Sequence, residues 1–206
     1  IAGVIGGAWF GGWMANQGLW REAFFLLGCL GLVYAVPYFM FLSTVNEEAQ
    51  VETRKASAGL AATELFKVPT FVMLCFVFPT FVFGLWMLYS WLPNFLFEKF
   101  SLSLADAAFT ATAYLQSATL VGLLCGGVLA DKLFLITKAS RLWLMAASLL
   151  LCAPCLHAIG HSTTLTATCF SAAAFGLASG FLMGNIFPAA FEVVPGDTRA
   201  SAVGLL

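Results

Sequence analysis

The residues of this chain that are best suited to an ionic interaction lie at the end of a long apolar segment. Asp131 and Lys132 directly follow GLLCGGVLA, residues 122–130, and Gly127 precedes the acid by four positions. Charge is unfavourable inside hydrocarbon and becomes tolerable where a helix leaves it, so an acid next to a base marks such an exit. The chemistry predicted for this pair is ion pairing, not bond breaking.

A carboxylate at one helix end is stabilised by the N-terminus of another helix, whose dipole and unpaired N–H groups attract an anion. We expect the Asp131 carboxylate to lie against the helix that begins near Thr198–Arg199, with Glu192 and Arg199 completing a charge cluster. The simpler alternative is that Asp131 and Lys132 are ordinary helix-end charges that only help to orient the chain.

Polar side chains inside the apolar segments form a second group of candidates, since polar groups in hydrocarbon must face protein or water. Trp86, Tyr89 and Ser90 share one helix face, because residues at i, i+3 and i+4 are neighbours on a helix. Gln116 lies within a similar polar stripe on the next segment. These residues are predicted to line a substrate cavity, with packing or a hydrogen bond between helices as the alternative.

Glycine spacing predicts how the segment at 164–191 is used. Gly176, Gly180 and Gly184 form a ridge at spacing four, which allows two membrane helices to approach closely. Ser171 and Asn185 fall on nearly the opposite face at heptad spacing, so that face is also predicted to line the cavity.

Two other glycine patterns predict close helix contacts. Gly122 and Gly126 have the small-xxx-small spacing, and Gly3, Gly7 and Gly11 form a ridge near the start of the chain. Both patterns are typical of surfaces on which membrane helices pack tightly.

Catalytic and metal-dependent functions are not predicted. His157 and His161 have a spacing that suits a metal on a helix, but Gly160 is expected to break the helix there and no third ligand is near. Cys152 and Cys155 lie in the middle of an apolar segment, where a thiolate is poorly solvated. Clustered nucleophiles of the kind an enzyme needs are not found at depth, so we predict no enzyme, cofactor, metal or disulfide framework.

The composition predicts a protein that lies in a membrane. Of the 206 residues, 61% are hydrophobic and only 9% are charged, which leaves too few charges to cover a water-facing surface. A spanning helix needs about 20 mostly apolar residues, and several windows qualify. The fold class predicted is therefore an all-α, polytopic membrane helix bundle. No basic patch supports nucleic-acid binding.

The elements that must position these residues follow from the apolar windows. Residues 1–16 are predicted to be the remnant of a helix, with complete spans at 23–42, 69–92, 107–130, 142–159 and 164–191 and a further span begun at 199. Pro79 and Gly84 predict a bend or a local unwinding in the second span, and residues 93–103 are predicted to be a loop.

The longest polar stretch, residues 43–68, is predicted to be a solvated linker. Its later part, 59–67, has an amphipathic pattern that suits the membrane surface. The linker separates residues 1–42, one helical region, from residues 69–206, a second one. Neither end resembles a natural terminus, so we expect an internal piece of a longer protein.

The orientation follows from the basic residues in short loops, because basic loops stay in the cytoplasm. Alternate loops on one side contain seven bases, whereas the other side contains two, Arg21 and Lys99. The seven are Arg54, Lys55, Lys67, Lys132, Lys138, Arg141 and Arg199. The linker and the Asp131 end of the bundle are therefore predicted to be cytoplasmic.

Two stretches resemble the major facilitator superfamily of transporters. Gly127-x-x-x-Asp131-Lys132 is similar to the family's Gly-x-x-x-Asp-Arg/Lys signature, although the later bases, Lys138 and Arg141, come after an apolar insertion. GLWREAF, residues 18–24, is similar to the family's Gly-Trp-Arg-x-x-Phe between its fifth and sixth helices, with Leu19 as an extra residue. The resemblance implies that the chain extends from the end of helix 5 to the start of helix 11 of a twelve-helix transporter.

The resemblance also implies a function. A carrier of this family moves its solute by alternating access, and its cytoplasmic latch holds the outward-open state. The residues predicted for the latch are Gly127, Asp131, Lys132, Glu192 and Arg199. We expect a secondary active transporter of a small organic solute in the cell (inner or plasma) membrane, coupled to H⁺ or Na⁺. No complete span has a charge near its middle, so a coupling residue is expected in other helices.

The branch of the family stays open. Residues 89–96, YSWLPNFL, are similar to the organic anion:cation symporters, which favours an organic anion or similar metabolite. Ala153-Pro154 and RASAVG, residues 199–204, are more similar to spinster-type carriers of lipid-like amphiphiles. A membrane sensor or scaffold that transports nothing is a third possibility.

Overall fold

The structure is a computed structural model that describes residues 2–44 and 63–206. Within these ranges the chain forms helices and no strand. The helices are α1 (Ala2–Asn16), α2 (Trp20–Thr44), α4 (Pro69–Phe100), α5 (Leu104–Phe134), α6 (Ser140–His161), α7 (Leu165–Val193) and α8 (Arg199–Leu205), with one 3₁₀ turn at Gly196–Thr198.

Five of these helices are long and apolar enough to cross a membrane: α2, α4, α5, α6 and α7. Two of these helices, α5 and α7, have a hydroxyl side chain as their N-cap. Ser103 accepts a hydrogen bond from the Asp106 N–H at the start of α5, and Thr164 does the same for Ala167 at the start of α7. The prediction of an all-α, multi-pass helix bundle is confirmed.

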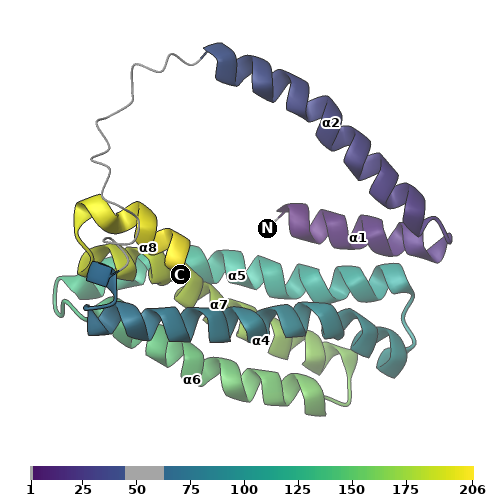
Figure 1. Cartoon of the computed structure of the whole chain (residues 1–206). Coiled ribbons are helices and arrows are strands. Elements are labelled where there is room, and N and C mark those ends of the chain that lie inside the picture. The colour runs from purple at the N-terminus through teal and green to yellow at the C-terminus, as the bar shows by residue number, and fades with distance from the viewer. Residues whose placement is uncertain (1, 45–62) are drawn as a thin grey trace.

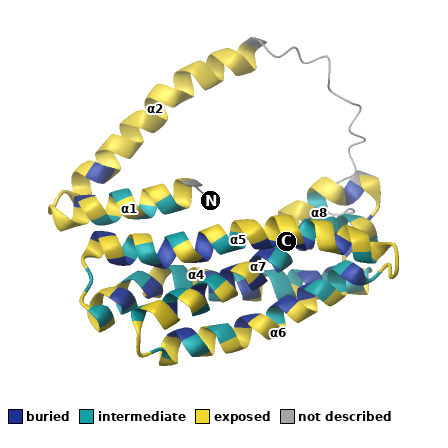
Figure 2. Cartoon of the chain, turned by 180° about the vertical axis from the view of Figure 1, so that it is seen from behind, coloured by how far each residue is buried: buried dark blue, intermediate teal, exposed yellow. Residues whose placement is uncertain are grey.

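Helix α7 is central to the bundle. It packs against α5 and α6, and α4 covers both α5 and α7, so that the four long helices lie side by side (Figure 1). α1 packs along α5, whereas α2 leads away from the bundle and is exposed along almost its whole length (Figure 2). The hydrophobic core therefore lies among α4, α5, α6 and α7.

The interface of α5 with α7 is built on glycine. A Cβ at Gly180 would lie 2.7 Å from the Leu123 backbone nitrogen and 2.8 Å from the Gly122 Cα, and a Cβ at Gly126 would lie 2.8 Å from the Phe181 Cα. The missing side chains thus allow backbone to touch backbone. The close packing predicted from Gly122, Gly126 and the 176–180–184 ridge is what the structure contains, and we call this interface the glycine seam.

Several helices are longer than the sequence suggested. α4 is continuous past Pro79 and Pro93 to Phe100, so the predicted unwinding and the predicted loop at 93–103 are wrong. The reason is packing, because Leu92 and Leu96 are buried in the core and helical spacing keeps both there. α6 likewise continues through Gly160 to His161.

Most of the predicted linker, residues 45–62, lies outside the described residues. At the described end of the linker Glu64, Phe66 and Lys67 are exposed, whereas Leu65 is fully buried against Phe71, Val194 and Ala202. This small apolar cluster fixes the start of α4 beside the end of α7 and the start of α8.

The two ends of the bundle differ as the loop alternation predicted. The end of α5, the start of α6 and the end of α7 meet at one end, where their charged side chains pair. At the other end the Lys99 ammonium on α4 donates to the Gly160 carbonyl on α6 (3.5 Å). The four helices of the bundle, α4 to α7, therefore run from one end of it to the other.

Candidate functional site

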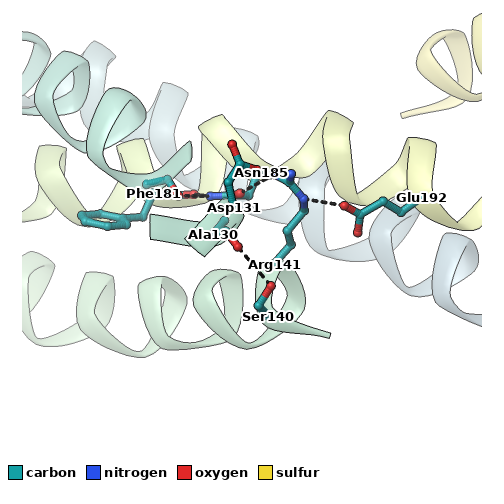
Figure 3. A network of polar contacts seen from close by, with 8 residues as sticks. Ala130, Asp131, Ser140, Arg141, Phe181, Asn185 and Glu192 are labelled. Atoms are coloured by element: carbon teal, nitrogen blue, oxygen red, sulfur yellow. Dashed lines mark hydrogen bonds and ion pairs between the residues drawn. The ribbon is translucent and has the colours of Figure 1, made fainter. Parts of the chain in front are cut away.

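Arg141 is the centre of a polar cluster at the basic end of the bundle (Figure 3). One guanidinium nitrogen, Nη2, donates to the Asp131 carboxylate at 2.5 Å, and Nε donates to the Glu192 carboxylate at 2.6 Å. Nη1 donates to the Asn185 side-chain oxygen at 3.1 Å. A single planar cation therefore links α5, α6 and α7.

Local structure brings these residues together. Asp131 lies in the last turn of α5, and Arg141 lies in the first turn of α6, beyond the short loop at residues 135–139. The Ser140 hydroxyl donates to the Ala130 carbonyl at 3.2 Å, which holds the start of α6 against the end of α5. Glu192 is close to the end of α7 and meets Arg141 from the other side.

The members of the cluster differ in exposure. The Arg141 side chain is 14% exposed, whereas that of Asp131 is 67% exposed and that of Glu192 is 34% exposed. Water and salt screen an exposed pair, so the Asp131–Arg141 pair by itself contributes little to stability. The mostly buried guanidinium is held by three partners, and its removal would leave two carboxylates close together without a cation.

Asn185 connects this cluster to the glycine seam. Its side-chain amide nitrogen donates to the Gly126 carbonyl on α5 (3.2 Å) and to the Phe181 carbonyl on α7 (2.8 Å). Asn185 has no exposed surface. A buried amide with all its partners in place fixes the distance between α5 and α7 at the point where Arg141 approaches.

The structure changes the predicted partners in the cluster. Asp131 binds Arg141 and not the backbone amides at the start of α8, so that expectation is wrong; Arg141 is only ten positions away across a short loop. Glu192 is in the cluster as expected. Arg199 is not: it donates to the Phe191 carbonyl (3.3 Å) and lies over the Phe191 ring.

The other two predicted latch residues have no ionic partner. Lys132 is exposed and forms no ion pair with the described residues, and Gly127 has open space where a Cβ would be. Sequence reasoning missed Arg141 as the hub, because the insertion after Lys132 separated this base from the signature. The available signal was that Asp131 and Arg141 stand at the two ends of one short loop between apolar segments.

The cavity candidates on α4 stay together on one face. The Trp86 and Tyr89 rings meet edge to face with centroids 6.0 Å apart, and the Ser90 hydroxyl donates to the Trp86 carbonyl. Trp86 is 64% exposed, whereas Tyr89 packs partly against the core. This geometry is compatible with a cavity wall, and the role stays a prediction.

The candidates on α5 and α7 are less accessible. Gln116 is buried and Ser171 is half-buried. Asn185 does not line an open cavity in this conformation, because it is fully enclosed and its amide is used within the cluster. At Asn185, the face of α7 predicted to line the cavity is thus in contact with α5 and α6.

Among the described residues no group of three His, Cys, Asp or Glu side chains is arranged so that it could hold a metal ion. The His157 and His161 rings stack with centroids 4.0 Å apart, and His161 Nδ1 is within hydrogen-bond distance of the His157 carbonyl.

Comparison with known families settles the class of protein. A profile described as Major Facilitator Superfamily matches residues 1–206, the whole chain. The chain belongs to the Major Facilitator Superfamily. Membership of this family favours a transporter over an enzyme.

One curated relative is similar over part of this major facilitator chain. It is described as "Probable sulfoacetate transporter SauU" of Cupriavidus necator, and it is 32% identical over 60% of this chain and 31% of its own length. The chain thus spans about a third of the length of that relative. No solved structure matches the chain.

Proposed function

We propose that the full-length protein is a secondary active transporter of a small organic anion that works by alternating access in the cell membrane. Membership of the major facilitator superfamily supports transport. The relative described as a probable sulfoacetate transporter supports a small organic acid as the solute. The solute site and any H⁺ or Na⁺ coupling belong to the complete protein.

The Arg141 cluster is proposed as the cytoplasmic latch. It joins the ends of three helices through one guanidinium, so a relative movement of these ends must break at least one of the three contacts. Because Asp131 and Glu192 are partly exposed, water can replace their contacts at low cost, which suits a device that opens repeatedly. This exposure is the observation that favours a latch over a permanent structural cluster.

The test is uptake of radiolabelled sulfoacetate and related small organic acids by the full-length protein in proteoliposomes. Arg141→Gln removes all three contacts, and we expect it to lower the initial uptake rate by about tenfold, in the range typical of coupling between states. Asp131→Asn removes one exposed pair and is expected to lower the rate only about threefold.

The control variant is Arg21→Gln, which removes a charge at the opposite end of the bundle, where Arg21 lies over the Trp20 ring. It is expected to transport normally. Uptake that is unaffected by Arg141→Gln and Asp131→Asn would remove the latch assignment and leave transport intact. Absence of any uptake with a folded protein would favour a sensor or scaffold instead.

A further inference from the structure

His157 and His161 come together on the last turn of α6. The helix break predicted at Gly160 does not occur, and α6 continues to His161, so the two histidines are neighbours at i and i+4 on one helix. Their rings stack with centroids 4.0 Å apart and planes inclined by 26°. One of the two arguments against a metal at this pair, the broken helix, therefore fails.

A backbone hydrogen bond determines which ring nitrogen of His161 is free. Its Nδ1 lies 3.0 Å from the His157 carbonyl oxygen, and because a carbonyl can only accept, the Nδ1–H group is the donor. In the neutral imidazole the lone pair is then on Nε2. Histidines that bind metals commonly donate their other ring N–H to a backbone carbonyl in this way. His161 is therefore prepared to coordinate a cation through Nε2.

The pair points away from the core at the polar end of the helix. Ile159 is buried, and at about 100° per residue it lies on the opposite side of α6 from both His157 and His161, which are exposed. His161 is the last residue of α6, and the polar residues 162–164, Ser-Thr-Thr, follow it. Access of water and ions to the rings therefore follows from their place at a helix end.

The charged side chains of α4 at this end of the bundle have other contacts. The Glu98 carboxylate accepts a hydrogen bond from the Asn94 amide at 2.9 Å, and the Lys99 ammonium lies over the Phe95 ring. Among the described residues no carboxylate is arranged as a third ligand. Two imidazoles are thus what this part of the chain offers, and water must complete the coordination of an ion.

The stacked rings are close to the geometry that chelation needs. Two nitrogens that bind one ion at about 2.0–2.1 Å lie about 2.9–3.4 Å apart. Rings with centroids 4.0 Å apart reach this spacing by a small rotation about χ2, a torsion with broad preferences in histidine. Imidazole suits Zn²⁺, Cu²⁺ and Ni²⁺, whereas Mg²⁺ and Ca²⁺ prefer oxygen ligands.

We propose that His157 and His161 together bind one divalent transition-metal ion, of the class of Zn²⁺ and Cu²⁺, with water as the remaining ligands. The bound ion joins the two ends of the last helical turn of α6 and stabilises this helix end, because it binds the folded turn better than an unfolded one. The site lies at the opposite end of α6 from the Arg141 cluster and does not depend on which solute the protein transports.

The number of bound ions tests whether the two rings share one metal. Full-length protein without a histidine tag is stripped with EDTA in detergent, and Zn²⁺ is titrated in a calorimeter. We expect His157→Gln and His161→Gln each to lose one Zn²⁺, and the double variant to lose that same single ion. Both positions are exposed, so the variants are expected to fold, with metal-free thermal unfolding like that of the unaltered protein.

Cu²⁺ gives a spectroscopic test of the ligands. In electron paramagnetic resonance, the spectrum of the unaltered protein minus that of the double variant is expected to show two nitrogen donors. Glu98→Gln, which changes an exposed carboxylate at the same end of the bundle, should leave the spectrum and the Zn²⁺ count unchanged. Gly160→Ala should also retain the ion, since α6 is already helical through this position.

Three results would overturn the proposal. Unchanged Zn²⁺ binding in both single variants would exclude the pair as a metal site. The loss of one ion in each single variant and of two in the double variant would show two separate surface histidines. A loss of Zn²⁺ in Glu98→Gln, with none in the histidine variants, would place the ion on α4.

Discussion

The same glycine spacing has two different outcomes in this protein. In the glycine seam, Gly122, Gly126 and Gly180 each lie so close to the opposing backbone that a Cβ would clash. In α1, the ridge of Gly3, Gly7 and Gly11 has nothing within 4 Å of any position a Cβ would take. A glycine repeat therefore shows that a helix permits close approach, but it does not show that a partner is present.

The glycine seam and the α1 ridge also differ in their surroundings. The seam lies within the core and leads to Asn185 and the Arg141 cluster, so helix packing and the polar contacts reinforce each other. α1 touches α5 through a neighbouring position, Gly12, whose Cβ would lie 2.8 Å from the Ala105 Cα. The contacting surface of α1 is rotated away from the predicted ridge, which is why the ridge is exposed.

The largest loss of stability is expected from a substitution that disrupts the glycine seam. Gly180→Ala adds a methyl group against the backbone of α5, and we expect it to destabilise the full-length protein by about 1–3 kcal/mol, as overpacking does. Gly7→Ala should leave the free energy of unfolding unchanged or raise it by up to about 1 kcal/mol, because alanine favours a helix more than glycine does. Thermal unfolding in detergent, followed by tryptophan fluorescence, measures both.

A destabilising Gly7→Ala would contradict the comparison, because it would show that the α1 ridge packs against a segment outside these 206 residues. Gly160→Ala serves as the matched control, since Gly160 is helical, exposed and unobstructed in α6.

A smaller effect is expected where α1 meets α5. Gly12→Ala would bring its Cβ to 2.9 Å from the Leu104 carbonyl oxygen, but Met14 is the one buried side chain among the described residues of α1, so this helix can shift more easily than α7. We expect a cost of about 1 kcal/mol. Gly11→Ala, one position along, should cost nothing in the same unfolding assay. Equal effects of the two changes would mean that α1 sits on α5 in a different rotation.

The smallest effect concerns a hydrogen bond across the seam. The Thr119 and Ser179 hydroxyls are 3.4 Å apart, and each already donates to a carbonyl in its own helix. Ser179→Ala is therefore expected to cost no more than about 0.6 kcal/mol, the average for such bonds in membranes. A cost as large as that of Gly180→Ala would show that this bond, and not the close backbone contact, holds α5 to α7.

Much of the fold could be predicted, and the site only in part. Each apolar window became a helix because a span has to satisfy its backbone groups internally. The helix ends were less predictable: α4 continues past Pro93 because Leu96 has a place in the core, which is a tertiary fact. For the site, Asp131 and Glu192 were found from their charge at segment ends, whereas Arg141 was set aside.

The sequence by itself determined that this protein folds in a membrane, which of its described segments are long and apolar enough to span one, and the end of the bundle at which charge collects. These properties follow from composition and segment length, which act on each stretch of chain separately. Only the tertiary structure decided which glycines pack, that Asn185 is enclosed, and that Arg141 joins Asp131 to Glu192. Those outcomes depend on how helices rotate against one another, and no single helix contains that information.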